Sequence, residues 1–176
     1  ETGEGVTRVA VGDRVAPLFN QFWFGGPLRN ARGGGDLGGG MDGVLADYIV
    51  LSEEGVSRIP DYLSYDEAAT LPCAALTAWA GLTCGTGIQP GDTVLVQGSG
   101  GVSVFALQFA KLFGARVIAT TSSSAKAERL QALGADEVID YVAQPDWGVA
   151  ARALTNGIGV DRVIEIGGPG TFQQSL

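Results

Sequence analysis

The sequence predicts an α/β protein whose carboxyl-terminal part forms a parallel sheet, and three observations carry this prediction. Residues Thr93–Gln97 are a continuous apolar run, which is typical of a strand buried on both faces. The large apolar side chains of the next segment recur on one helical face. Strand-like and helix-like segments then alternate, which favours parallel strands joined by right-handed crossovers. The helical face comprises Val102, Phe105, Ala106, Phe109, Ala110 and Phe113.

Three more strands are expected after the first, at residues 116–120, 137–140 and 160–166. Helices are expected between them, at residues 125–133 and 149–154. We expect the spatial order 3-2-1-4, a common order of doubly wound parallel sheets. Strands one and four then flank the crevice at the carboxyl edge of the sheet, where ligands of such sheets bind.

The amino-terminal region has a different texture, with short strands and loops. Residues 12–15 and 45–51 are β-prone runs beside turn residues, and we expect both to be strands. Residues 24–43 include nine glycines, which predicts a loop. A flexible surface insertion is the ordinary interpretation of such a loop, and a lid over a pocket is the alternative.

Two helices are expected between this region and the first strand of the sheet. Ser64 and Glu67 form a capping-box pattern, which predicts a helix that ends near Pro72. A second helix is expected over residues 73–82, followed by a turn at residues 89–92.

Composition excludes several classes of function. The chain has 176 residues, 45% hydrophobic and 17% charged, with a net charge of −8, which indicates a folded acidic protein. It contains no histidine, and its two cysteines form no C-x-x-C pair, which excludes a disulfide framework or a closed structural zinc site within the chain. We expect no nucleic-acid or membrane partner, a cytoplasmic location and a small-molecule substrate.

A few side chains could carry chemistry, but each has an ordinary structural interpretation. Cys73 and Cys84 are expected to be small buried residues. Tyr48 and Tyr65 are candidate proton donors by residue type alone, and a core or surface role is the stronger interpretation. The aromatic run Phe22, Trp23 and Phe24 could line a pocket, although such a run more often belongs to a core.

The motif Gly98-x-Gly100-Gly101-Val102 follows a buried strand and opens a helix. Gly98 permits the tight turn, and Gly100 lets the backbone approach a pyrophosphate without a Cβ clash. The helix amino terminus then offers N–H groups and a positive dipole end to the phosphates. Ser103 replaces the third glycine of the usual pattern, so the match is imperfect. A plain strand–helix turn is the alternative.

The stretch from Gly12 to Leu176 resembles the medium-chain dehydrogenase/reductase superfamily. It is most similar to the zinc-independent, quinone-reductase-like branch with NAD(P)-dependent alcohol dehydrogenase-like members. No single motif is specific, but together they follow the superfamily's order. The motifs are Gly12-Asp13-Arg14-Val15, Glu67-Ala68-Ala69-Thr70-Leu71-Pro72, Leu76-Thr77-Ala78-Trp79, the glycine motif, Leu133-Gly134-Ala135-Asp136 and Gly159-Val160-Asp161-x-Val163.

The resemblance implies a partial GroES-like catalytic domain over residues 1–62. It implies a partial Rossmann domain, a doubly wound parallel sheet, over residues 63–176, with hinge helices at 65–83. Superfamily members carry catalytic-domain sequence before the matched stretch and two further strands after it. The chain is therefore expected to be a central fragment, inactive by itself, of a protein that can form homo-oligomers.

The resemblance also bears on zinc. Zinc-dependent members carry a four-cysteine lobe, whereas residues 16–60 of this chain contain no cysteine. Their catalytic zinc uses a cysteine near the position of Cys73, with other ligands upstream, so no zinc is expected here. Three alternatives stay open: a zinc-dependent alcohol dehydrogenase, a nucleotide-binding module without activity, and a structural protein on the same fold.

Superfamily members transfer a hydride between a nicotinamide and a carbonyl, quinone or enone/alcohol substrate. The resemblance places Thr77 beside the nicotinamide and Tyr141 near the adenosine. A threonine bonded back to its own helix is the alternative for Thr77. Gly167 and Gly168 end the fourth strand, where the backbone is expected to pass close to the ribose or nicotinamide.

The sequence predicts NADP(H) rather than NAD(H). NAD sites usually place an acidic residue at the end of the second strand, and residues 120–126 contain none. Ser122 and Ser123 offer hydroxyls and Lys126 a positive charge, and similar members use the positions of Ser122 and Lys126 for the 2′-phosphate. The alternative is that the serines are helix caps and Lys126 is a solvated lysine.

Overall fold

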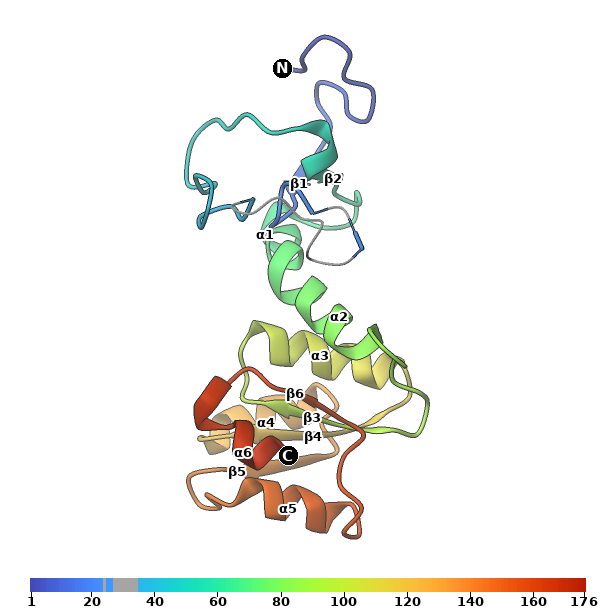
Figure 1. Ribbon diagram of the computed structural model, residues 1–176, viewed down its shortest axis with the longest axis vertical. Coiled ribbons are helices and arrows are strands. Elements are labelled where there is room, and N and C mark those ends of the chain that lie inside the picture. Colours follow the sequence, from blue (N-terminus) through green and yellow to red (C-terminus); the bar gives the residue numbers. More distant parts are fainter. Residues whose placement is uncertain (24, 27–34) are drawn as a thin grey trace. The chain divides into compact units, whose positions relative to one another are not determined.

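The computed structural model describes residues 1–23, 25–26 and 35–176, and these residues form two compact units, Glu1–Cys73 and Ala74–Leu176. Each unit is described by itself, and Figure 1 labels the elements. The predicted domain boundary at residues 62 and 63 stays a prediction, because compactness alone does not define a domain.

The second unit contains a sheet of four parallel strands in the order β5-β4-β3-β6. The strands are β3 (Thr93–Gln97), β4 (Arg116–Thr121), β5 (Glu137–Asp140) and β6 (Arg162–Ile164). This confirms the predicted α/β class and the predicted strand order. Because the strands are parallel, their carboxyl ends lie at one edge of the sheet, with β3 and β6 adjacent.

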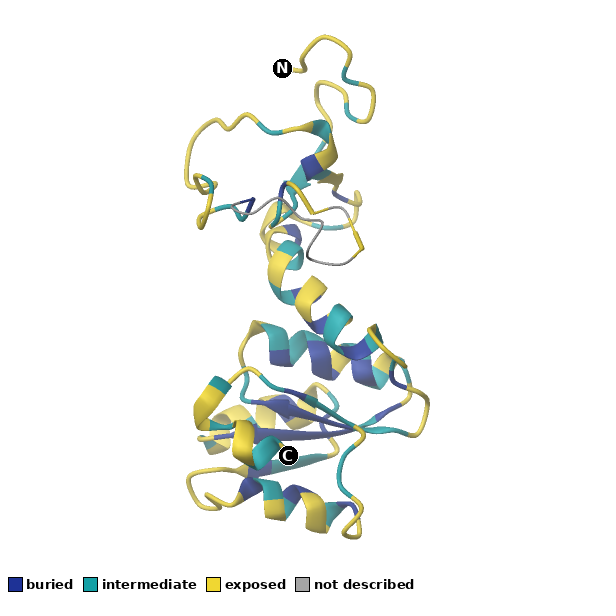
Figure 2. Ribbon diagram, viewed as in Figure 1, coloured by how far each residue is buried: buried dark blue, intermediate teal, exposed yellow. Residues whose placement is uncertain are grey.

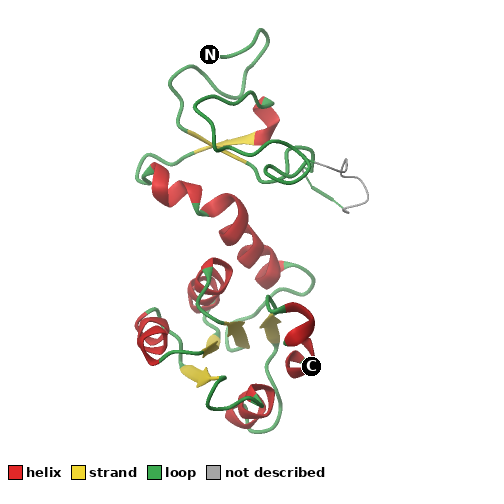
Figure 3. Cartoon of the chain, turned by 90° about the vertical axis from the view of Figure 1, so that its left-hand side faces the viewer, coloured by secondary structure: helices red, strands yellow, loops and turns green. Residues whose placement is uncertain are grey.

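Helices cover both faces of this sheet, as the end-on view in Figure 3 shows. One face packs against α2 (Leu76–Thr83), α3 (Gly101–Leu112) and α4 (Ser124–Ala132), and the other against α5 (Trp147–Leu154). The short helix α6 (Phe172–Ser175) follows β6 in the chain and contacts α5.

The alternation of side chains along β3 explains the two-sided core. Val94 and Val96 join the cluster beneath α3, whereas Leu95 joins the cluster beneath α5, and all three are at most 1% exposed. Full burial of such a side chain stabilises the fold by about 1.5–3 kcal/mol. Figure 2 shows this burial along β3 and β4. The apolar run in the sequence therefore reflects a strand that is covered on both faces.

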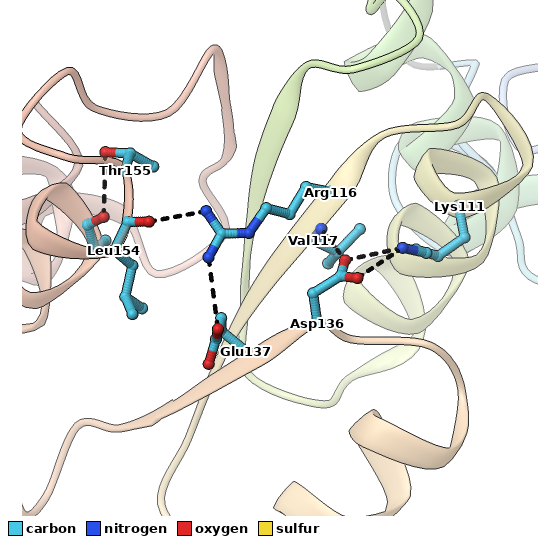
Figure 4. A network of polar contacts seen from close by, with 8 residues as sticks. Lys111, Arg116, Val117, Asp136, Glu137, Leu154 and Thr155 are labelled. Carbon is cyan, nitrogen blue, oxygen red and sulfur yellow. Dashed lines mark hydrogen bonds and ion pairs between the residues drawn. The ribbon is translucent and has the colours of Figure 1, made fainter.

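A network of hydrogen bonds and ion pairs links the amino ends of β4 and β5 to the neighbouring helices, at the edge opposite the carboxyl ends (Figure 4). Lys111 at the end of α3 donates to both oxygens of Asp136, at 2.8 and 3.1 Å. Asp136 also accepts from the backbone N–H of Val117 at 2.7 Å. Arg116 pairs with Glu137 at 3.5 Å and donates to the carbonyl of residue 154.

The first unit contains a small antiparallel pair, β1 (Val15–Pro17) with β2 (Val56–Arg58), and the helix α1 (Tyr65–Ala69). The predicted capping box is present. The Glu67 N–H donates to Ser64 Oγ at 3.1 Å, and the Ser64 N–H donates to the Glu67 carboxylate at 2.8 Å. A further helical turn, Leu71–Ala75, precedes α2.

The expectation of a strand at residues 45–51 is wrong, because this segment has no regular structure. Leu45, Tyr48 and Val50 are each at least 94% exposed. A strand needs a hydrogen-bonding partner, and none of the described segments pairs with this run. Of the residues 24–43, those at 24 and 27–34 lie outside the described part, so neither interpretation of the glycine-rich loop is tested there.

Several expectations of burial are also wrong. Cys73 and Cys84 are both exposed, because one lies on the outer face of a helical turn and the other ends α2. Phe22 and Trp23 are 40% and 43% exposed, so they do not form a core, and Phe24 lies outside the described residues. None of the described helices combines the length and hydropathy needed to cross a bilayer.

Candidate functional site

A glycine loop joins β3 to α3 at the carboxyl edge of the sheet. Gly98 has φ = +72°, a conformation that L side chains rarely adopt, so the turn depends on glycine. A Cβ added at Gly98 or Gly100 would meet no described atom within 4 Å, so both positions border open space. The loop can therefore receive a ligand group directly against its backbone.

The amino terminus of α3 opens onto this loop. Gly100 is the N-cap residue and offers no capping side chain, and the first intrahelical bond runs from the Val104 N–H to the Gly100 carbonyl at 2.9 Å. The N–H groups that precede this bond make the helix amino terminus a site for an anion. Gly101 serves packing instead, because a Cβ there would lie 3.3 Å from the Cβ of Ala74.

Ser103 ties the first turn of α3 to the end of β3. Its side chain is fully buried, and Oγ donates to the Gln97 carbonyl at 2.5 Å. The serine therefore does more than satisfy the small-residue requirement of the third glycine position. It closes the loop between residues 97 and 103 with a buried hydrogen bond.

A cavity of about 400 Å³ lies beside this loop. It brings together three of the predicted site residues, Gly98, Tyr141 and Gly167. Its position at the carboxyl ends of β3, β4 and β6 is where open α/β sheets bind ligands. The lining consists of Gln97, Gly98, Thr120, Tyr141, Pro145, Trp147, Ile166, Gly167 and Thr171.

Glu165 directly follows β6 and collects five hydrogen-bond donors. Its Oε1 accepts from the N–H groups of Gly167 (2.7 Å) and Gly168 (2.9 Å) and from Thr171 Oγ1 (2.6 Å). Its Oε2 accepts from Gln97 Nε2 (2.6 Å) and from Ser175 Oγ. Although partial burial raises the pKa of Glu165, the bonds from Ser175, Thr171 and Gln97 outweigh it and lower the pKa to about 2.

Gln97 faces the same loop from the end of β3. It is 6% exposed, and its Oε1 accepts from the N–H groups of Ile166 (3.2 Å) and Gly167 (3.1 Å). These bonds draw the backbone away from the sheet after Ile164. Strand β6 therefore ends at Ile164, before the predicted residue 166, because the N–H groups of Ile166 and Gly167 bond to a side chain instead of a neighbouring strand.

The end of β4 is rich in hydroxyl groups and lacks an acid. Ser123 is the N-cap of α4, yet its hydroxyl makes no capping bond to any described residue. Ser122 and Lys126 are exposed, and the described first turn of α4 contains no acidic residue. Asp140 is the register partner of Thr121 in the neighbouring strand β5, and it is an acid. Its Oδ1 is already bonded locally, because it accepts from the N–H of Val142 at 2.9 Å.

Comparison with known proteins connects this geometry to a family. Residues 101–176 match the zinc-binding dehydrogenase family. A zinc-type alcohol dehydrogenase-like protein of Schizosaccharomyces pombe is 43% identical over the whole chain. A putative alcohol dehydrogenase of Sinorhizobium meliloti superposes on 98% of the chain with a TM-score of 0.89 and 45% identity. Along its whole length the chain is therefore similar to alcohol dehydrogenase-like members of the medium-chain dehydrogenase/reductase superfamily.

The chain spans about half the length of the superfamily members it matches, 51% of both the yeast and the Sinorhizobium protein. A further similar structure, that of a mycobacterial protein, is a complex with NADPH. It covers 69% of this chain at 37% identity, the chain covers 38% of it, and the TM-score is 0.64.

Not every residue predicted for the site lines the cavity. Thr77 is exposed in α2, and Val102 is half-buried in the first turn of α3. Gly168 directly follows the lining residue Gly167, whereas Gly100 and Gly101 lie two and three positions after the lining residue Gly98. The hydroxyl-rich turn after β4 follows the lining residue Thr120. The roles of all eleven predicted residues stay predictions: Thr77, Gly98, Gly100, Gly101, Val102, Ser122, Ser123, Lys126, Tyr141, Gly167 and Gly168.

Sequence reasoning missed Gln97 and Glu165. A signal existed for the first, since a glutamine that ends an otherwise apolar strand must find buried hydrogen-bond partners. The described residues contain no assembled zinc site. Cys73 and Cys84 are exposed, and the described residues supply no group of three His, Cys, Asp or Glu side chains.

Proposed function

We propose that this chain forms the dinucleotide-binding part of a nicotinamide-dependent oxidoreductase that prefers NADP(H) to NAD(H). The observation that carries the proposal is the open glycine loop at the amino terminus of α3, next to a cavity at the carboxyl edge of the sheet. The mycobacterial protein solved with NADPH supports the same cofactor class.

In this proposal the chain's residues bind and orient the cofactor. The backbone from Gly98 to Val102 binds the pyrophosphate, because the helix amino terminus stabilises an anion. Tyr141 lies beside the adenosine, and Gly167 and Gly168 let the backbone run close to the ribose and nicotinamide. Thr77 lies beside the nicotinamide.

The bound cofactor supplies the hydride, and the protein supplies position and charge. The reaction class we propose is transfer between the nicotinamide and a carbonyl, quinone or enone/alcohol substrate, without zinc. The alcohol dehydrogenase names of the yeast and Sinorhizobium relatives support the carbonyl/alcohol pair. The mechanism needs a proton donor, and the exposed Tyr48 and Tyr65 are not placed in that role.

The preference for NADP(H) rests on the turn after β4. Ser122, Ser123 and Lys126 present hydroxyls and a positive charge, and the serine that caps α4 leaves its hydroxyl without a capping bond to the described chain. A charge-assisted hydrogen bond contributes about 1.5–3 kcal/mol. Because Lys126 is exposed and its charge is screened, we expect the lower end, roughly a tenfold preference.

The test is the dissociation constant of NADPH and of NADH, measured by calorimetry for the wild type and three variants. Lys126→Ala should weaken NADPH and leave NADH nearly unchanged, and Ser122→Asp should reverse the preference. Arg129→Ala is the matched control, because it removes the same charge from the far end of the same helix. Equal binding of both cofactors by the wild type would refute the NADP(H) assignment.

A further inference from the structure

The carboxylate of Glu165 has no capacity left for a ligand. An ionised carboxylate offers about four lone-pair sites, and Glu165 already receives five donors from Gln97, Gly167, Gly168, Thr171 and Ser175. A ribose hydroxyl of the cofactor would have to displace one of them. Glu165 can therefore influence the cavity through the backbone it holds.

We propose that Glu165 is a positioning residue that fixes the backbone wall of the cavity at Ile166–Gly168 and thereby sets the affinity for the dinucleotide. The N–H groups of Ile166, Gly167 and Gly168 donate to the side chain of Gln97, of Glu165 or of both. The wall is thus held by one side chain at the end of β3 and by one that directly follows the adjacent strand β6. The effect on affinity rests on the proposed function, whereas the effect on the backbone does not.

The partnership of Gln97 and Glu165 is specific in its donors and acceptors. Gln97 Nε2 donates to Glu165, while Gln97 Oε1 accepts from the wall. In a Glu165→Gln variant, the new amide nitrogen would meet either Gln97 Nε2 or the N–H groups of Gly167 and Gly168. A flip of the Gln97 amide would relieve the first clash, but it would direct the Gln97 nitrogen at the N–H groups of Ile166 and Gly167. Each of these arrangements opposes donors to donors, so the wall must shift.

Exchanging the two residues restores the pattern. In the double variant Gln97→Glu with Glu165→Gln, the new carboxylate accepts from Ile166 and Gly167 with one oxygen. Its other oxygen accepts from Ser175 and from the new amide. The new amide oxygen accepts the hydrogen bonds from Gly167, Gly168 and Thr171 that Glu165 Oε1 accepts in the wild type. All donors are satisfied, and the net charge equals that of the wild type.

Electrostatics and positioning predict opposite signs for Glu165→Gln. Removing a negative charge near the cavity favours an anionic cofactor, so charge alone predicts tighter binding. Loss of the wall geometry predicts weaker binding. Glu137→Gln is the matched control, because it removes one negative charge from the opposite edge of the same sheet.

The experiment compares dissociation constants for NADPH in the full chain and its variants. We expect Glu165→Gln to raise the constant by about tenfold or more, as a disturbed charge-assisted bond would. We expect the double variant to regain most of the lost affinity. Ser175→Ala, which removes one donor from outside the cavity lining, should weaken binding less. Wild-type affinity in Glu165→Gln, tighter binding, or a double variant no better than Glu165→Gln would overturn the inference.

Amide hydrogen exchange separates this inference from the proposed function. Without cofactor, the amides of Gly167 and Gly168 should exchange faster in Glu165→Gln than in the wild type and recover in the double variant. A wild type that binds no dinucleotide would overturn the proposed function and the affinity part of the inference. Unchanged exchange at both glycines would overturn the positioning role itself.

The single variant Gln97→Glu adds a pH readout. It places two carboxylates in contact, which raises the pKa of one of them. The pair therefore shares a proton at low pH and releases it as the pH rises. That proton restores a donor between the two residues, and binding of NADP⁺ relative to wild type should improve as the pH falls. A ratio to wild type that does not change with pH would contradict the inference.

Discussion

Replacing Asp136 with alanine should destabilise the second unit more than removing its lysine partner. Asp136 accepts from Lys111 Nζ and from the N–H of Val117, at the amino edge of the sheet. The ion pair is half-exposed, with side-chain exposures of 34% for Lys111 and 37% for Asp136. A pair of this kind is worth about 0–1 kcal/mol.

The backbone bond is worth more, because Val117 is fully buried. A buried N–H left without a partner costs about 1–3 kcal/mol. We therefore expect Asp136→Ala to lower the free energy of unfolding by about 1.5–3 kcal/mol, and Lys111→Met by less than about 1 kcal/mol. Asp136→Asn keeps an acceptor for Val117 and should resemble Lys111→Met.

Urea denaturation provides the assay, followed by tryptophan fluorescence and far-ultraviolet circular dichroism. Trp147 is 7% exposed in the second unit and reports its unfolding. Although burial raises the pKa of Asp136, the bonds from Lys111 and Val117 lower it below 3.8. The stabilisation by Asp136 is therefore complete at pH values above the ordinary pKa of an aspartate, and it is lost as the pH falls through the lowered pKa of the folded state. A cost for Lys111→Met equal to that for Asp136→Ala would refute this reasoning.

Three further predictions concern individual side chains. Ser64→Ala should lower stability by about 0.5–2 kcal/mol by removing the cap of α1, as thermal unfolding would show, and a matching loss in Glu67→Ala would support the reciprocal box. Ser103→Ala should cost about 1 kcal/mol and speed amide exchange in the glycine loop, because the Gln97 carbonyl loses its donor. The pKa of Glu165, about 2 in the fold against 4.5 ordinarily, predicts stability that is constant above pH 4.5 and falls towards pH 2, and Glu165→Gln should remove that part of an acid titration.

The sheet could be predicted because a strand that is buried on both faces consists of apolar residues, and this is visible in the sequence of the strand itself. Val94, Leu95 and Val96 are apolar on both faces, so a short window of sequence was sufficient. The glycine loop was equally local. The run at residues 45–51 has similar β propensity, but pairing is a property of two segments and cannot be read from one.

The contact between Gln97 and Glu165 could not be predicted, because the two residues are 68 positions apart in the chain. It depends on the register that pairs Val96 with Ile164. The exposure of Cys73 was also missed, because the usual burial of cysteine is an average over proteins and says nothing of one helical face.

The bond from Ser103 to the Gln97 carbonyl has a thermodynamic consequence for any ligand of the glycine loop. It cross-links the two ends of a short segment, so few backbone conformations are left to lose when a ligand binds. A receptor that is ordered in advance spends little binding free energy on its own immobilisation. The loop should therefore bind with a small entropic penalty, and insertions between residues 97 and 103 should be tolerated poorly.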